Sequence, residues 1–223
     1  EGTRAVVLTL RPMLRDPLFR AGLVLRLALV VLLVPQIQLD WFVPFVEFAI
    51  AHPSLDPWSH FLAAGGAPVA YPYGPVMLIA HLPGAVPGWL LDQATGQRVF
   101  TGIGFRAGLL MADLAALALL HALFPKHPRR LLWLYWWSPL VLFATYWTGQ
   151  TDIVPVALLL LSLVLLREHR ARAAGIALGL SLAAKFSMLL AVPFVAIYLW
   201  RNKRLRALQA PFAIGLLLGF LPQ

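Results

Sequence analysis

The chain has 223 residues, of which 61% are hydrophobic and only 12% are charged. A soluble globular protein carries about 25% charged residues, so this composition excludes a water-soluble domain and indicates that lipid surrounds most of the chain. Backbone groups in lipid must be satisfied internally, and the long apolar runs lack the alternation of barrel strands. The sequence therefore predicts an all-α protein, a polytopic transmembrane bundle of about seven or eight membrane segments.

Charge pattern and cysteine content exclude further classes. The net charge is +9, but the 18 Lys and Arg residues fall in short clusters between apolar runs, so nucleic acid is not predicted as a partner. The chain has no cysteine, which excludes disulfides and thiolate ligands. Its six His residues lack the spacing of a zinc site, so we predict no metal. A phosphate-binding glycine loop is also missing from the sequence, which argues against nucleotide chemistry.

The first elements in chain order set the predicted topology. Residues 1–20 are basic and are predicted to lie in the cytoplasm, before a first span at 21–37. Between Arg26 and Arg98 there is no Lys or Arg, although the window contains several acids and aromatic residues. The loop at about 38–75 is therefore predicted to be extracytoplasmic.

The next segments are predicted from apolar runs and their breaks. Residues 41–51 are predicted to form an amphipathic helix on the membrane surface. The stretch at 76–91 contains Pro83-Gly84 and Pro87-Gly88, which predicts a kinked, short or re-entrant segment, with an uninterrupted span as the alternative. Further spans are predicted at 101–124, 131–147, 153–166 and about 207–222.

Residues 173–200 are apolar except for Lys185. The basic clusters at 126–130, 167–172 and 201–206 should all be cytoplasmic, so this stretch must cross the membrane twice. Each half has about 14 residues, or ~21 Å of helix, which is short for a hydrocarbon core of ~30 Å. The turn at Lys185 should therefore lie within the outer leaflet. One straight span of 28 residues is the alternative.

Charged residues at or within a membrane are candidates for function. Asp40 follows the first span and precedes Trp41; it is either an interfacial polar residue or a general base held at the lipid–water boundary. Lys185 either snorkels, forms a structural pair with Asp113 or Asp152, or binds a phosphate group as a point charge.

Two further sets of polar residues have a structural interpretation beside the functional one. Gln150 and Asp152 precede the span at 153–166, where Asp152 would suffice as a helix N-cap. Arg106 and Asp113 are seven residues apart on one predicted helix and share a face, so we predict an internal structural pair. The predicted topology brings Asp40, residues 71–75, Gln150, Asp152 and Lys185 to the extracytoplasmic side.

Five weak motifs occur in an order that resembles a known family. They are an acid after the first span, a long outer loop ending in Tyr71-Pro-Tyr-Gly-Pro75, a span with Arg and Asp, Thr148-Gly-Gln-Thr-Asp152, and a small-residue stretch from Ala174 to Leu180 followed by Lys185. Over residues 20–205 the chain resembles the GT-C superfamily of integral membrane glycosyltransferases. The most similar type is the bacterial mannosyltransferase that uses polyprenyl-phosphate mannose.

The resemblance implies an activity and a site. The activity is inverting transfer of a hexose, mannose, from a polyprenyl-phosphate donor to an extracytoplasmic acceptor at the bacterial plasma membrane, with no cofactor besides the donor substrate. Asp40 corresponds to the catalytic base, and the implied substrate-binding residues are Lys185, Gln150, Asp152, Tyr71 and Tyr73. Asp40 lacks a second adjacent acid, so the resemblance implies no metal-binding Asp-x-Asp site.

Two other functions fit the same sequence. The chain could be a non-catalytic scaffold subunit in a complex with other membrane subunits, which would tolerate Asp40→Ala. A transporter for a lipid-linked solute also uses broken helices, but its internal repeat is not found by eye. Residues 21–223 are interpreted as one transmembrane module with membrane lipids around it, and the chain is expected to be part of a longer protein.

Overall fold

The computed structural model describes residues 14–201 and 207–221. Within these ranges the chain forms helices and no β-strand, which confirms the predicted all-α class. The described helices are α2 (Pro17–Leu32), the π-helical turn η1 (Gln38–Phe42), α3 (Val43–Ala51), α4 (Pro57–Ala63), α5 (Pro75–Thr95), α6 (Phe100–Leu123), α7 (Pro128–Leu131), η2 (Leu132–Trp136), α8 (Pro139–Leu142), η3 (Phe143–Trp147), α9 (Ile153–Arg167), α10 (Ala171–Ala184), the 3-10 helix η4 (Phe186–Ala191), α11 (Val192–Arg201) and α12 (Gln209–Phe220).

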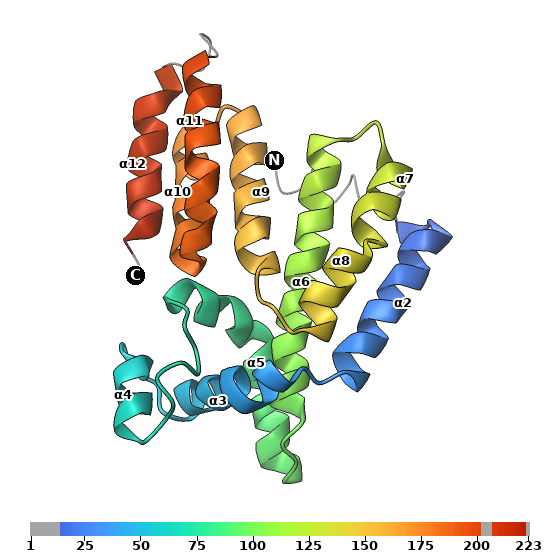
Figure 1. The fold of residues 1–223 in the computed structure, drawn as a ribbon, viewed down its shortest axis with the longest axis vertical. Coiled ribbons are helices and arrows are strands. Elements are labelled where there is room, and N and C mark those ends of the chain that lie inside the picture. Colours follow the sequence, from blue (N-terminus) through green and yellow to red (C-terminus); the bar gives the residue numbers. More distant parts are fainter. Residues whose placement is uncertain (1–13, 202–206, 222–223) are drawn as a thin grey trace.

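The long helix α6 separates two upright groups of helices (Figure 1). Helices α9, α10, α11 and α12 stand side by side in one group, and α2 stands with α7 and α8 on the other side of α6. Helices α3, α4 and α5 lie beneath the α9–α12 group in this view. The segment at 38–75 is therefore a compact cap on one end of the bundle.

The basic clusters gather at the opposite end of the bundle. The Arg167 Nη1 group donates a hydrogen bond of 2.9 Å to the carbonyl oxygen of Leu123, which joins the ends of α9 and α6. Arg129 Nε lies 3.8 Å from Asp16 Oδ2 at the start of α2. The clusters at 126–130 and 167–172 thus share one end, as the predicted topology requires, and most of the cluster at 201–206 lies outside the described residues.

The chain reverses direction at Lys185. Its backbone is extended, with φ −154° and ψ 118°, between the last turn of α10 and the start of η4. Val195 and Leu199 of α11 pack back against Ala174 and Leu178 of α10 in one buried cluster. Residues 173–200 therefore form a hairpin, and the straight helix of 28 residues is wrong.

Helix α5 covers the segment at 76–91, which was predicted to be kinked, short or re-entrant, with an uninterrupted span as the alternative. It is continuous over 21 residues, with Pro83 and Pro87 inside it. Both prolines are four residues apart on the exposed side of the helix, so the missing N–H donors leave the packed face intact. On that packed face, a Cβ added at Gly84 would lie 2.1 Å from the carbonyl oxygen of Gly104 in α6. Close packing against α6 thus holds the segment helical despite its prolines.

The segment predicted as one span at 131–147 is interrupted instead. A π-helical turn ends near Trp136, and a new helix starts after Ser138, whose hydroxyl accepts from the backbone N of Val141. Pro139 cannot donate a backbone hydrogen bond, so the helix restarts there. The indole of Trp136 donates to the carbonyl oxygen of Phe19, 3.1 Å away, which ties the first half to α2.

Two pairs of helices approach each other through glycines spaced four residues apart. Gly175 and Gly179 of α10 face Gly215 and Gly219 of α12, and a Cβ at Gly215 would lie 2.1 Å from the carbonyl oxygen of Arg172. Gly84 and Gly88 of α5 approach α6 in the same way. Small residues at this spacing let helix backbones touch, a pattern common between transmembrane helices.

The cap at 38–75 is held together by aromatic rings rather than by small residues. Phe45 stacks on Tyr71 with ring centroids 4.7 Å apart and meets Trp58 and Phe61 at 5.4 and 5.3 Å. The predicted helix at 41–51 forms as η1 and α3, but its buried face packs against these rings. The cap is therefore a packed part of the protein, with its own aromatic core.

Length and composition identify one described helix, Phe100–Leu123, as able to cross a membrane by itself. Shorter apolar helices in the described ranges are Ile153–Arg167, Ala171–Ala184, Phe186–Arg201 and Gln209–Phe220.

Candidate active site

Lys185 and Asp152 form an ion pair where the α9–α12 group meets the cap. Lys185 Nζ donates to Asp152 Oδ1 at 2.5 Å. The side chains remain 29% and 41% exposed, respectively, so an anion can reach the ammonium group. Of the two predicted partners for Lys185, Asp152 is confirmed, and the prediction of Asp113 is wrong.

Asp152 stands at the N-terminus of α9 but does not cap it. No side-chain capping hydrogen bond joins Asp152 to the described first turn of α9. The prediction that capping alone accounts for this residue is therefore wrong, because its carboxylate is directed to Lys185.

The loop before α9 is hydrogen-bonded to the residues that follow the first predicted span. Gln38 Nε2 donates a buried hydrogen bond of 3.0 Å to the carbonyl oxygen of Gly149. Gly149 has φ +74°, and a Cβ there would lie 2.7 Å from Pro35, so only glycine fits this approach. The half-buried Gln150 follows, and its backbone N donates to the carbonyl oxygen of Ala144.

Tyr71 and Tyr73 bring the cap against the turn at Lys185. Tyr71 is buried and its hydroxyl has no hydrogen-bond partner among the described residues, while Tyr73 is half-buried and meets the Tyr71 ring edge-on at 5.3 Å. Burial raises the pKa of Tyr71 well above its usual value, so its hydroxyl stays protonated. A Cβ at Gly74 would lie 3.3 Å from the carbonyl oxygen of Ala183. The predicted convergence of the Tyr71–Pro75 turn with Lys185 is confirmed.

Asp40 lies apart from this group. Its carboxylate is exposed and accepts a 2.7 Å hydrogen bond from Gln36 Nε2. Gln38, two residues earlier in the same turn, faces Gly149, so Asp40 points to another side. Among the described residues, no ion pair or hydrogen bond joins Asp40 to Lys185 or Asp152.

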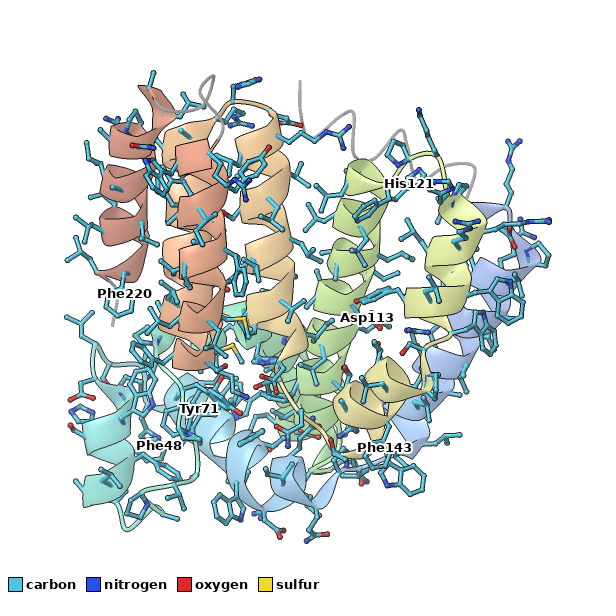
Figure 2. All side chains as sticks on the ribbon, turned by 45° about the horizontal axis from the view of Figure 1, so that its top comes forward. Phe48, Tyr71, Asp113, His121, Phe143 and Phe220 are labelled. Carbon is cyan, nitrogen blue, oxygen red and sulfur yellow. The ribbon has the colours of Figure 1, made fainter. Side chains whose placement is uncertain are left out.

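The predicted pair of Arg106 and Asp113 is wrong. Asp113 instead accepts from Arg26 Nε of α2 at 2.7 Å, and both side chains are fully buried. The hydroxyls of Tyr135 and Tyr146 donate to the same carboxylate at 2.7 and 2.8 Å. Figure 2 shows Asp113 about midway along α6, between His121 near one end of the bundle and Tyr71 near the other. Arg106 Nε donates to the backbone of α2, at the carbonyl oxygen of Val30.

A polar cavity of about 420 Å³ beside the cap contains residues that the sequence prediction missed. It is lined by Glu47, Trp89, Asp92, Gln93, Gln97 and Arg98. Burial, followed by the nearby charge of Asp92, raises the pKa of Glu47. Asp92 itself accepts from the backbone N of Val99 and Phe100 and caps α6. A signal for this cavity was present in the sequence. Glu47 and Asp92 are two of the acids between Arg26 and Arg98, a stretch that contains no Lys or Arg.

Within the described residues there is no group of three or more His, Asp or Glu side chains that could hold a metal ion. The polar groups at this end of the bundle include the accessible ammonium of Lys185, the carboxylates of Asp152 and Asp40, and the hydroxyls of Tyr71 and Tyr73.

This arrangement defines an all-helical protein with an accessible cation where apolar helices meet an aromatic cap. The model of glycosyltransferase family 87 matches residues 71–222. The chain belongs to this family, which confirms the glycosyltransferase part of the predicted resemblance. The match includes Tyr71, Gln150, Asp152 and Lys185, whereas Asp40 precedes it. No curated protein and no solved structure matches the chain.

Proposed function

We propose that the protein is an integral membrane glycosyltransferase of the GT-C type that transfers a hexose, mannose, from a polyprenyl-phosphate donor to an acceptor hydroxyl. The observation that carries the proposal is the accessible ammonium of Lys185, held at the turn of an apolar hairpin inside the family match. A lipid-linked donor would present its phosphate at this boundary between apolar helices and water. Lys185 would then bind the phosphate and stabilise the charge that develops as it leaves.

The membrane part of the proposal is supported by the surface of the helices. Large apolar side chains are exposed on both groups of helices, among them Leu134 at 77%, Leu190 at 77% and Phe194 at 73%. Soluble proteins rarely expose apolar patches on this scale, so these side chains would face lipid. Polar residues meet at one end and basic clusters at the other, which supports a cytoplasmic basic end and an extracytoplasmic site.

The proposed reaction is a single displacement. An acceptor oxygen attacks the anomeric carbon of the sugar, and the bond from that carbon to the phosphate oxygen breaks with inversion. Asp40 takes the proton from the acceptor hydroxyl, and the polyprenyl phosphate departs with its electron pair. Gln150, Tyr73 and Asp152 would surround the donor, and Asp152 would exchange its contact with Lys185 for one shared with the phosphate.

Replacing Asp40 tests this mechanism. In proteoliposomes supplied with polyprenyl-phosphate mannose, Asp40→Asn should slow mannosyl transfer by about 10²–10⁴-fold, because the amide cannot accept the proton. Asp16→Asn, at the opposite end of α2, is the matched control. Transfer at the wild-type rate by Asp40→Asn would remove Asp40 from the mechanism.

The proposed orientation of the protein in the membrane can be tested by labelling. Single cysteines at Gln150 and Arg129 in intact vesicles should be labelled by a membrane-impermeant maleimide from opposite sides, because basic clusters remain cytoplasmic. Labelling of both positions from one side would contradict the proposed topology.

A scaffold subunit that assembles with other membrane proteins is the second candidate. The observation that favours it is the separation of Asp40 from the Lys185–Asp152 pair. On this alternative, Asp40→Asn and wild type would both lack transfer activity but would bind partner subunits equally.

A further inference from the structure

A second place in the structure combines an apolar surface with positive charge. A groove of about 270 Å³ runs between the end of α2, the η1–α3 turn and the first half of α6. Its apolar lining includes Val31, Val34 and Leu39, which are 54%, 49% and 51% exposed, so the groove opens to the surroundings. It lies on the side of α6 that faces α2, whereas Lys185 lies at the foot of α10 (Figure 1).

Arg106 supplies a buried charge to this groove. Its side chain lines the groove, although the residue is only 3% exposed. A Cβ at Gly102, another lining residue, would lie 3.4 Å from Arg106 Nη1, so the guanidinium group passes directly over the groove wall. Among the described residues, no carboxylate lies within ion-pair distance of Arg106.

The missing carboxylate sets Arg106 apart from the other buried arginine. Arg26 is fully buried as well, but Asp113 neutralises it at 2.7 Å. A buried cation without an anion is unfavourable, because it loses its hydration without gaining a charged partner. The groove is therefore complementary to a ligand that brings one negative charge and an apolar body.

Arg98 adds a second cation and connects the groove to a polar space. It is exposed and lines both the apolar groove and the polar cavity that contains Glu47. On the cavity side stand Gln93, Gln97 and Trp89, whose amides and ring suit a head group with hydroxyls. Along this path an apolar surface, two guanidinium groups and a polar cavity follow one another.

We propose that this groove binds a membrane lipid with a phosphate head group. The acyl chain of the lipid lies on Val31, Val34 and Leu39. The phosphate bridges Arg106 and Arg98, and the hydroxylated end of the head group enters the cavity beside Glu47. Guanidinium groups bind phosphate oxygens through paired, charge-assisted hydrogen bonds, which a Lys cannot reproduce. The site is separate from the Lys185–Asp152 pair, and it requires contact with lipid but not glycosyl transfer.

Phosphatidylglycerol is a suitable probe, because it joins acyl chains, a phosphate diester and two hydroxyls. The full chain, purified in detergent, is titrated with this lipid, and the complex is quantified by native mass spectrometry. Arg98→Gln should weaken binding roughly tenfold or more, the scale expected for losing a hydrogen bond to a charged group. Val31→Trp should also weaken binding, because the larger side chain occupies the groove in place of the acyl chain. Arg106→Gln should do the same.

Arg167→Gln is the matched control, because Arg167 lies at the basic end of the bundle, where its Nη1 donates to the backbone carbonyl oxygens of Ala122 and Leu123. It should bind the lipid like wild type. Arg98 and Val31 are exposed, so their variants keep the test valid even if Arg106→Gln fails to fold. Wild-type affinity in both Arg98→Gln and Val31→Trp would overturn the proposal.

Two further ligands identify what the groove recognises. Diacylglycerol, which lacks the phosphate, and glycerol 3-phosphate, which lacks the chains, should both bind far more weakly than phosphatidylglycerol. Equal binding of either one would overturn a lipid phosphate as the ligand. Mannosyl transfer is assayed separately, so lipid binding that depends on Arg98 would support this site even in a protein without transfer activity.

Discussion

Two ion pairs in this protein have similar chemistry and opposite surroundings. Arg26 and Asp113 are fully buried in the middle of the bundle, where Tyr135 and Tyr146 occupy the remaining sites on the carboxylate. Lys185 and Asp152 are about one-third exposed at the edge of the cap. The first pair has no room for a ligand, whereas the second can exchange its partner.

The difference shows that charge in an apolar chain is not by itself evidence for a binding site. The Arg26 guanidinium also lies 3.5 Å above the centre of the Trp136 ring, so its surroundings hold it on several sides. Such a pair fixes how α2 packs on α6. A cation that serves a substrate must instead keep one side open, as Lys185 does.

The largest effect should follow from breaking the buried pair. Asp113→Asn leaves Arg26 buried without a counter-charge and should lower the free energy of unfolding by about 3–5 kcal/mol. Denaturant unfolding in micelles, followed by tryptophan fluorescence, measures the change. Asp16→Asn is the control: its pair with the exposed Arg129 is 3.8 Å long, and asparagine caps α2 equally well. A loss in Asp113→Asn no larger than in this control would contradict a structural role.

A smaller effect on stability, with a clear effect on binding, is expected at the open pair. Lys185→Met should change the unfolding free energy by less than about 1 kcal/mol, because partly exposed pairs contribute little. Donor affinity should fall roughly tenfold through the loss of a charged hydrogen bond to phosphate. Both quantities are measured on the same preparation, by unfolding and by titration with polyprenyl-phosphate mannose.

The double variant Lys185→Met/Asp152→Asn completes this test. If the pair were structural, the second change would restore stability lost in the first, and donor binding would recover with it. On the phosphate-binding hypothesis, the double variant stays as weak in donor binding as Lys185→Met.

A still smaller effect on the free energy of unfolding is expected for another carboxylate, that of Glu47. Its pKa is raised by burial and then by Asp92, so the folded protein holds the proton more tightly than the unfolded chain. Stability should therefore fall slightly as the pH rises through the range above 4.5, the ordinary value of the group. Glu47→Gln should remove this slope and unfold at a higher denaturant concentration than wild type at neutral pH. A steeper slope in the variant would contradict the raised pKa.

Sequence reasoning located the hairpin at Lys185 correctly, because basic clusters on both sides required an even number of crossings. It also brought Tyr71–Pro75 and Asp152 to Lys185. These predictions depended on the charge and hydrophobicity of successive segments in the sequence. Those patterns indicate at which end of the bundle each loop lies.

The partner of Asp113 could not be predicted in the same way. Arg106 shares a face with Asp113, but seven residues of helix separate them by about 10 Å along the axis. Arg26 is 87 positions away in sequence and is brought close only by the packing of α2 on α6. The continuity of α5 was predicted only as the alternative for a related reason, since its prolines are compensated by glycine contacts with another helix. Paired glycines four residues apart in α5, α6, α10 and α12 were the signal that would have indicated this packing.

The glycine contact between α10 and α12 has a consequence for the time at which Lys185 acquires its position. A chain is synthesised from its N-terminus, so α10 is complete while residues 209–220 have yet to be added. During that interval Gly175 and Gly179 lack the backbone that they touch in the finished protein. The helix that leads to Lys185 thus gains this neighbour only after residues 209–220 have been added, so the growing chain carries the Lys185 cation before α10 is packed against α12.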